Sequence, residues 1–443
     1  MKKIFCLVCM IFLSVGIISC SSGSSENKQS YLPQEQNEIN AFKKQINLKD
    51  INAVDVNGDT PLLFAVKNEK SDAVIDYLIS QKANIEARDK NGYTSLMIAI
   101  RKHYNRPKLA LALIKNGADV NAAFDKPYDK EDKMTPLMYA VSEYIYTRPE
   151  VIQALIDAGA DVNAKNAEEL TPLLIAAGDS RNFEHINILV KAGADIEARS
   201  KTGRTPLMNA IRLNGRCPEI AIALILNKAN VNATYNKPYD KEDKMTPLMY
   251  ATDKGAMTIK STVLQALIDA GANVNAKNAE GNTPLLLASH YASDPENIEV
   301  LLKSGANIEE RDKNGYTPLM ISLWNGAFPD ITLTLIRNKA NVNAAGIDEK
   351  KRTALLIALD YYTAAPAKII KALIESGANV NVKDADGKTA LIYAAKNTDD
   401  ERVKIIIDTN KVDLYAKDKA GKTAFDYAKI NSRLKEKDLK KLK

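Results

Sequence analysis

The sequence predicts an all-α repeat solenoid that follows an export signal and a short polar tether. A six-residue phrase, of which TPLMYA at 135–140 is one copy, recurs eleven times at intervals of 34 to 41 residues. A second phrase, such as GADVNA at 159–164, stands before most copies of the first. Self-similarity at such a period is the signature of stacked repeats, each of which buries its apolar face against its neighbours.

The N-terminus has the organisation of an export signal. The chain opens with MKK, and an apolar run follows over 4–18, which is shorter than the roughly twenty residues that cross a bilayer as a helix. The junction Ser19-Cys20 then leads into SSGSS. This segment resembles the lipobox of bacterial lipoproteins. The resemblance implies that residues 1–19 are removed as a signal peptide and that the Cys20 thiol is acylated, so that palmitate would label the protein.

Two alternatives to the lipobox stay open at this point, an ordinary signal peptide with an incidental Cys and a retained membrane helix. Residues 20–38 are rich in Ser, Gln, Asn and Glu. Such a composition is typical of a flexible chain. We therefore predict a tether over 20–38 that starts at the lipidated Cys20.

Each repeat is predicted to be a helix, a turn, a second helix and an extended loop. The Thr of the first phrase can accept a hydrogen bond from a backbone N–H at the start of the first helix, and the Pro after it needs no donor. The second helix, for example over 151–156, ends near a residue such as Gly159 that can adopt the left-handed conformation. The eleven Thr residues are Thr60, Thr94, Thr135, Thr171, Thr205, Thr246, Thr283, Thr317, Thr353, Thr389 and Thr423.

The two phrases resemble the ankyrin repeat, whose signature is Thr-Pro-Leu-His-x-Ala at a period of about 33 residues. The resemblance covers about residues 40–432. It implies about eleven helix-turn-helix repeats joined by extended hairpin loops, in a domain over 39–443 with a capping segment at each end.

This sequence departs from the ankyrin pattern at two positions. Lys replaces the helix-ending Gly at Lys82, Lys228 and Lys339, where the left-handed conformation costs on the order of 1 kcal/mol. The His of the phrase is apolar in ten copies and Asp in one, so we expect packing to replace the hydrogen bonds of that imidazole. The residues in its place are Leu63, Met97, Met138, Leu174, Met208, Met249, Leu286, Met320, Leu356, Ile392 and Asp426.

A longer period lies over the repeats. KPYDKEDKMT at 126–135 recurs at 237–246, and RDKNGYT at 88–94 returns at 311–317, which indicates blocks of three repeats, about 111 residues each. The segments 126–133 and 237–244 lengthen two loops, and we expect them to protrude as a first finger and a second finger.

The fingers are candidate contact sites, because each carries a Tyr behind a conformationally restricted Pro and Tyr is a favoured interface residue. The alternative is a recent duplication whose copies have no selected use. The candidate protein-binding residues are Lys126, Tyr128, Lys130, Lys237, Tyr239 and Lys241 in the fingers, and Tyr93 and Tyr316 in the repeated turn.

The sequence offers no catalytic, metal or cofactor constellation. His103, His185 and His290 lie in separate repeats, without Cys or carboxylate at metal-ligand spacing. The calcium-loop-like segment at 55–59 is followed by Thr where Gly is required, and is predicted to be an inter-repeat turn. Cys217 would remain with Cys20 after cleavage, which predicts no disulfide framework. A net charge of +6 over 443 residues does not favour nucleic acid as a partner.

The ankyrin resemblance implies a non-catalytic scaffold that binds a protein partner through loop tips and first helices, with no cofactor, nucleic acid or small-molecule substrate. With the lipobox, it predicts a bacterial membrane lipoprotein on the exported side, in the periplasm or on the cell surface. Two other functions stay open: an envelope structural or tethering lipoprotein, and a secreted or surface factor that engages host proteins. The end LKEKDLKKLK is expected to be a solvated cap, with docking to anionic lipid as the alternative.

Overall fold

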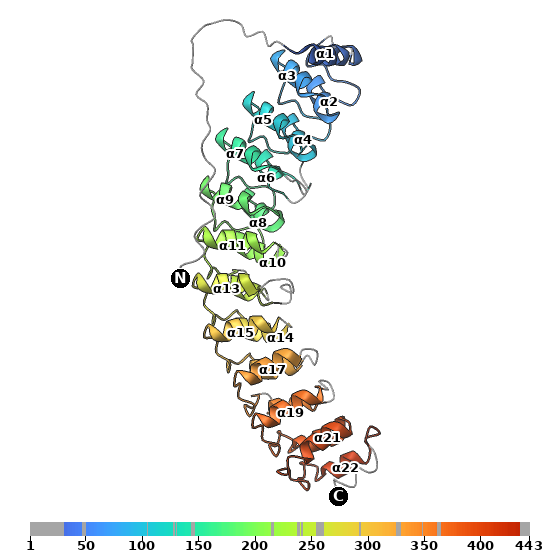
Figure 1. Ribbon diagram of the computed structural model, residues 1–443, viewed down its shortest axis with the longest axis vertical. Coiled ribbons are helices and arrows are strands. Elements are labelled where there is room, and N and C mark those ends of the chain that lie inside the picture. The colour runs from blue at the N-terminus through green and yellow to red at the C-terminus, as the bar shows by residue number, and fades with distance from the viewer. Residues whose placement is uncertain are drawn as a thin grey trace.

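The helices stack in pairs along one axis and form a long, gently curved array (Figure 1). The computed structural model describes residues 31–46, 50–103, 105–126, 129, 131–142, 147–213, 217–236, 240, 242–253, 261–291, 294–324, 329–347, 349–360 and 365–434. Within them the chain forms 22 α-helices, and β pairing is limited to two isolated antiparallel bridges. The predicted all-α repeat solenoid is confirmed.

Each repeat contributes one helix to each of two rows, and helices of one row contact their neighbours in the same row. The row of first helices, each beginning after the repeated Thr, comprises α2 (Pro61–Lys67), α4 (Ser95–Lys102), α6 (Pro136–Ala140), α8 (Pro172–Asp179), α10 (Pro206–Leu213), α12 (Pro247–Tyr250), α14 (Pro284–His290), α16 (Pro318–Trp324), α18 (Ala354–Ala358), α20 (Ala390–Asn397) and α22 (Ala424–Ala428). The row of second helices comprises α1 (Pro33–Gln45), α3 (Asp72–Ser80), α5 (Pro107–Lys115), α7 (Pro149–Asp157), α9 (Phe183–Lys191), α11 (Pro218–Leu226), α13 (Ser261–Asp269), α15 (Pro295–Lys303), α17 (Pro329–Arg337), α19 (Ala367–Glu375) and α21 (Asp400–Ile407).

Local sequence explains where these helices begin and end. In ten of the eleven copies the Thr hydroxyl accepts a hydrogen bond from the backbone N–H three residues later, and Thr353 is the exception. The second helices end close to a residue with positive φ, which is Gly in six repeats. Lys82, Lys228 and Lys339 hold the same place with φ of 60°, 70° and 64°. The left-handed conformation predicted for these three lysines is confirmed.

The core runs the length of the array and is made of short aliphatic side chains. The ten apolar residues at the expected His position are at most 1% exposed. Asp426 is the exception, because it lies on the exposed last helix and its carboxylate accepts hydrogen bonds from the N–H and the hydroxyl of Thr423. The expectation that packing replaces the imidazole is therefore confirmed for the ten apolar residues.

A hydrogen-bond ladder joins each extended loop to the next. In the second phrase, the side-chain oxygen of an Asn or Glu accepts a hydrogen bond from a backbone N–H in the extended loop of the next repeat, at 2.7–2.8 Å. Six of the asparagines also donate to a carbonyl of that next loop. The ten acceptors are Asn52, Glu86, Asn121, Asn163, Glu197, Asn232, Asn275, Glu309, Asn343 and Asn381.

The loop tips are tight turns that use the carboxylates for their own backbone. Asp55 accepts hydrogen bonds from the N–H groups of Asn57 and Asp59, and Asp89 and Asp312 do the same in their turns. The segment at 55–59 is therefore an inter-repeat turn, as predicted.

The array starts earlier than the sequence indicates. Helix α1 packs against α3 as the second helix of an incomplete repeat, and it buries Ile39 and Phe42. Residues 33–38, which the sequence assigns to the tether, belong to this helix. Their Gln, Glu and Asn side chains lie on its solvated face, so their polar composition does not distinguish them from a flexible chain. Cys20, the signal segment and the Lys-rich end after residue 434 lie outside the described residues.

Candidate protein-binding face

Both fingers leave and re-enter the array at one point, because the chain pairs with itself at each base. Phe124 donates its N–H to the Met134 carbonyl at 2.8 Å, and Lys133 donates to the Phe124 carbonyl at 2.7 Å. Tyr235, Lys244 and Met245 repeat this pairing in the second finger at 2.8 Å for both bonds. Two closely spaced bonds at the base fix where each finger departs from the array.

Of the predicted finger residues, Lys126 is described, and its N–H donates to the Asp132 carboxylate at 3.2 Å. The structure does not describe the other five. The residues outside the described part are Tyr128, Lys130, Lys237, Tyr239 and Lys241.

Glu131 anchors the first finger to the first helices. Its carboxylate accepts hydrogen bonds from the hydroxyls of Tyr93 and Tyr139, at 2.8 and 2.9 Å, and from the guanidinium of Arg101 at 2.9 Å. The Tyr93 ring also stacks on Phe124, with the ring centroids 4.6 Å apart. Burial and the hydrogen bond to Glu131 raise the pKa of Tyr93 to about 12. Tyr93 therefore stays protonated and acts as a donor that holds the finger.

Glu242 anchors the second finger with a different set of donors. Its carboxylate accepts from Arg204 at 2.6 Å, from Arg212 at 3.2 Å and from the Tyr250 hydroxyl at 2.9 Å. Burial by itself would raise the pKa of Glu242, but the hydrogen bonds from Arg204 and Tyr250 outweigh burial and the pKa is lowered. The carboxylate therefore stays ionised between its cations at neutral pH.

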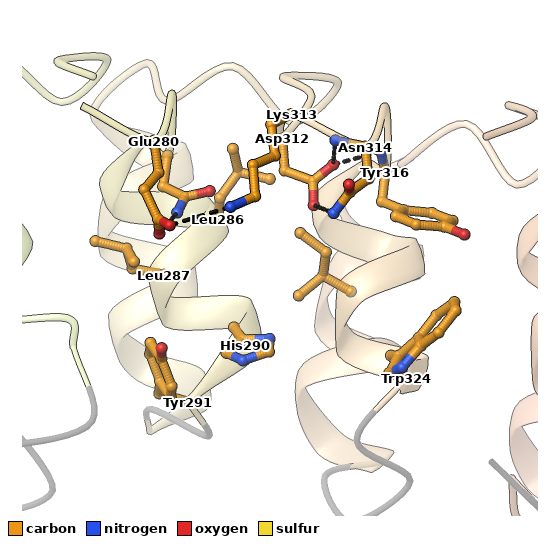
Figure 2. A pocket seen from close by; sticks show the side chains of 12 residues that line it. Glu280, Leu286, Leu287, His290, Tyr291, Asp312, Lys313, Asn314, Tyr316 and Trp324 are labelled. Carbon is orange, nitrogen blue, oxygen red and sulfur yellow. Dashed lines mark hydrogen bonds and ion pairs between the residues drawn. The ribbon is translucent and has the colours of Figure 1, made fainter. Parts of the chain in front are cut away.

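Two adjoining hollows lie on the face of the first helices, across α12, α14 and α16. One has a volume of about 370 Å³ and the other about 340 Å³, and they share the lining residues Glu280, Asn282, Leu287 and Tyr291. Figure 2 shows the second hollow between α14 and α16, with the loop tips above it and the helix ends below it. Leu287 is buried in its floor, while Trp324 at the end of α16 is 46% exposed. These hollows make one surface in which apolar and charged side chains are mixed.

The charged rim of the second hollow is held by the loop tips. The Lys313 ammonium lies 3.1 Å from the Glu280 carboxylate, and this pair crosses between two repeats (Figure 2). Tyr316 is only 8% exposed, and its ring centroid lies 5.2 Å from that of Trp324. The predicted contact residue Tyr316 thus packs against Trp324. Trp324 is the one Trp of the chain and is not among the residues predicted from the sequence.

The family of the chain follows from its repeats. A family model described as ankyrin repeats, in sets of three copies, matches residues 34–124, 137–235, 220–312, 259–345, 291–384 and 361–436. The chain belongs to the ankyrin-repeat family. An ankyrin array is a scaffold for interaction between proteins, which agrees with a pre-formed face of helices and loop tips.

Two groups of known proteins resemble parts of this ankyrin array. Protein phosphatase 1 regulatory subunit 12A of Mus musculus and of Rattus norvegicus is 43% identical over 61 residues, which is 14% of this chain and 6% of those proteins. Among solved structures, the ankyrin repeat domain of Bcl-3, described as a unique member of the IkappaB protein family, matches with a TM-score of 0.44 and 26% identity. This match covers 56% of this chain and 99% of that chain.

The histidines occupy unlike environments in the ankyrin array. His103 and His185 are each 3% exposed, and burial lowers the pKa of both. The ring of His290 meets the ring of Tyr291 edge-on in the second hollow, with centroids 4.4 Å apart. Cys217 is a free, half-buried thiol just before α11. Among the described residues, no group of three His, Cys, Asp or Glu side chains is placed to hold a metal ion.

Proposed function

We propose that the chain is a membrane-anchored ankyrin scaffold on the exported side of a bacterial membrane, which holds a protein partner and carries out no chemistry. The observation that carries the proposal is the pair of hollows on the first-helix face. The hydrogen-bond ladder supports it, because a face that is already ordered loses little entropy when a partner binds.

The anchor rests on the residues around Cys20. None of the helices in the described ranges is long and apolar enough to cross a bilayer, and the proposed attachment is through acyl chains. Two or three acyl chains are enough for stable attachment, whereas one is marginal.

The anchor is tested by Cys20→Ser. We expect this variant to lose labelling by palmitate and to accumulate as an unprocessed or soluble form, while the control Cys217→Ser keeps both label and membrane attachment. Palmitate labelling that survives in Cys20→Ser would refute the lipoprotein assignment.

The partner is sought by cross-linking the full chain in intact envelopes and purifying it after solubilisation in detergent. A stoichiometric protein from the same envelope supports the scaffold. Recovery of cell-wall material or only of further copies of the chain would support the envelope structural role, and recovery of host proteins by chain released from cells would support the secreted or surface factor.

The fingers are proposed as a second contact region for the same partner. Their anchoring through Glu131 and Glu242 supports this role, because a fixed base limits the positions that each tip can reach. The bases are three repeats apart, and packed helices lie roughly 8–10 Å from one another, so the two bases stand on the order of 30 Å apart. Two weak contacts at such a separation add through effective concentration.

The test of the fingers is a binding series against the partner identified by cross-linking. We expect Tyr128→Ala and Tyr239→Ala each to weaken binding modestly, and the double variant to weaken it far more. A double variant that binds like the wild type would show that the fingers take no part.

A further inference from the structure

Two positions of the repeat place cations along the first-helix face, the residue directly before the repeated Thr and the residue seven after it. Eight of these residues are Lys or Arg. Two of the eight, Lys396 and Lys422, are exposed and form no ion pair within the part of the chain that the structure describes. The other six lie 2.6–3.2 Å from a carboxylate, and they are Lys67, Arg101, Arg204, Arg212, Arg352 and Lys388.

The two unpaired lysines approach the same aromatic ring from consecutive repeats. Lys396 lies in the last turn of α20 and Lys422 precedes α22. Their ammonium nitrogens are 5.8 and 5.6 Å from the centroid of the Tyr427 ring. The Tyr427 hydroxyl donates a hydrogen bond to the Asp418 carboxylate at 2.6 Å, which holds the ring in place. Lys396, Lys422 and the Tyr427 ring together form a basic site near the C-terminal end of the array (Figure 1).

The carboxylates of the adjoining loop tips do not neutralise the basic site. The tips 383–388 and 417–422 carry five lysines and three aspartates. Asp384 and Asp418 are buried, and each accepts hydrogen bonds from two backbone N–H groups of its own turn and from a Tyr hydroxyl. The third, Asp386, pairs with a lysine of its own tip at 2.8 Å. The tips therefore add positive charge to the basic site.

The elements on either side of the basic site do not reverse this balance. In the preceding repeat, Asp360 is paired with Arg352 at 2.6 Å, and the tip 347–352 carries three cations and two carboxylates. In α22, Asp426 accepts hydrogen bonds at the start of its own helix and lies 3.4 Å from the Lys429 ammonium. Because opposite charges steer and favour association, this surface favours an acidic occupant.

We infer that the basic site binds an acidic segment of the partner, with a Glu or Asp carboxylate between the ammonium groups of Lys396 and Lys422. Hydrogen bonds from an ammonium group to a carboxylate are stronger than those between neutral groups. Two cations that approach one ring suit a single carboxylate better than a broad anionic surface such as a membrane. This inference rests on the proposed function, since it names the chemistry of the partner segment and its place on the array.

The probe is a labelled synthetic peptide with four consecutive glutamates, and the matched peptide has glutamines in their place. Binding to the full chain in detergent is measured by fluorescence anisotropy. We expect the Glu peptide to bind, the Gln peptide not to bind, and the affinity to fall as salt is added, because exposed charges are screened. A Glu peptide that does not bind, or equal binding of the two peptides, would overturn the inference.

A variant series then locates the site of the Glu peptide. We expect Lys396→Gln and Lys422→Gln each to weaken binding by about fivefold, the effect of one partly exposed ion pair, and the double variant to weaken it further. Lys396→Arg keeps the charge and should keep binding. The control is the double variant Lys90→Gln and Lys165→Gln, which removes two charges from exposed loop tips of earlier repeats and should leave binding unchanged. An equal loss in the control would show that net charge alone attracts the peptide.

A lipid competitor tests the other anionic occupant. Detergent micelles that contain phosphatidylserine are added to the complex with the Glu peptide, and micelles that contain phosphatidylcholine serve as the control. We expect neither to displace the peptide. Displacement by phosphatidylserine alone would assign the basic site to a lipid surface and overturn the inference.

The partner identified by cross-linking separates this inference from the proposed function. If that partner binds the double variant of Lys396 and Lys422 at full strength, the basic site is not its docking position while the scaffold function stands. If no partner protein is recovered at all, it is the scaffold function that fails, whatever the affinity of the Glu peptide.

Discussion

The first and second fingers share one sequence but rest on different supports. The first glutamate, Glu131, is held by two tyrosine hydroxyls and one guanidinium, and its side chain is 21% exposed. The second, Glu242, is held by two guanidiniums and one tyrosine hydroxyl, and its side chain is 10% exposed. An identical segment is thus fitted to two neighbourhoods through one carboxylate that accepts from whichever donors are near.

A duplicated segment can therefore keep its geometry while its energetics change. The Glu242 carboxylate lies between two cations and is more buried than the Glu131 carboxylate, which lies mainly among hydroxyls. Breaking the interactions of the more buried, charged group costs more free energy. The helices that follow the two fingers, α6 and α12, by contrast begin with the same four residues, PLMY, and all four are buried in both.

The largest effect is expected in the shared part. Leu137→Ala in α6 and Leu248→Ala in α12 each remove a fully buried side chain and should destabilise the array locally by about 2–5 kcal/mol. Because the two helices are equivalent, we expect losses of similar size in the two blocks. Amide exchange should show faster exchange in the mutated repeat and its neighbours, and a uniform change along the chain would contradict the nearest-neighbour model.

The next effect should distinguish the two fingers. Glu242→Gln leaves two guanidiniums without their carboxylate and should cost about 2–3 kcal/mol, whereas Glu131→Gln should cost about 1 kcal/mol. The matched control is Glu349→Gln, at the equivalent exposed position of the third block, which should have no effect. Since the pKa of Glu242 is lowered in the folded state, its stabilisation is present above the ordinary Glu pKa and is lost as pH falls below that value. Equal losses in the two variants, measured by urea unfolding, would show that the supports are equivalent.

A smaller effect concerns the ends of the second helices. Lys228 has φ of 70°, while Gly117 holds the equivalent place in the first block with φ of 85°. A Cβ added to Gly117 would meet no atom within 4 Å, so the exchange tests conformation alone. Lys228→Gly should stabilise its repeat, and Gly117→Lys destabilise the other, each by about 1 kcal/mol. Changes of the same sign in the two variants would contradict this account.

The smallest effect on stability at neutral pH is expected from the substitution His185→Asn. The equivalent of His185 in the second block is Asn297. Both side chains are 3% exposed. Burial lowers the pKa of His185 in the folded state, so the unfolded chain binds the extra proton as pH falls below about 6.5, the ordinary His pKa. Wild type should therefore lose thermal stability between pH 7.5 and pH 5.5, and His185→Asn should lose less. A pH dependence unchanged by the substitution would assign it to other groups.

Much of the fold could be predicted because its signals are local. The Thr hydroxyl, the Pro after it and the helix-ending Gly or Lys act within one turn of a helix, and the repeat makes each signal recur. The ladder was not predicted, because the partner of Asn121 or Asn275 lies a whole repeat away. The start of α1 was missed because its buried residues, Ile39 and Phe42, are few among polar neighbours.

In the candidate site, too, features set by neighbours along the chain could be predicted, and contacts between repeats could not. The sequence by itself determined the repeat, its periodicity, the two duplicated insertions and the block structure, because helix caps and apolar spacing depend on neighbours along the chain. Only the tertiary structure decided which side chains meet: that Glu131 and Glu242 hold the finger bases, that Tyr316 packs against Trp324, and that Lys396 and Lys422 lie exposed beside Tyr427. The reason is that exposure at the surface of an array depends on the loop of the next repeat, whose reach and path are settled only when the repeats stack.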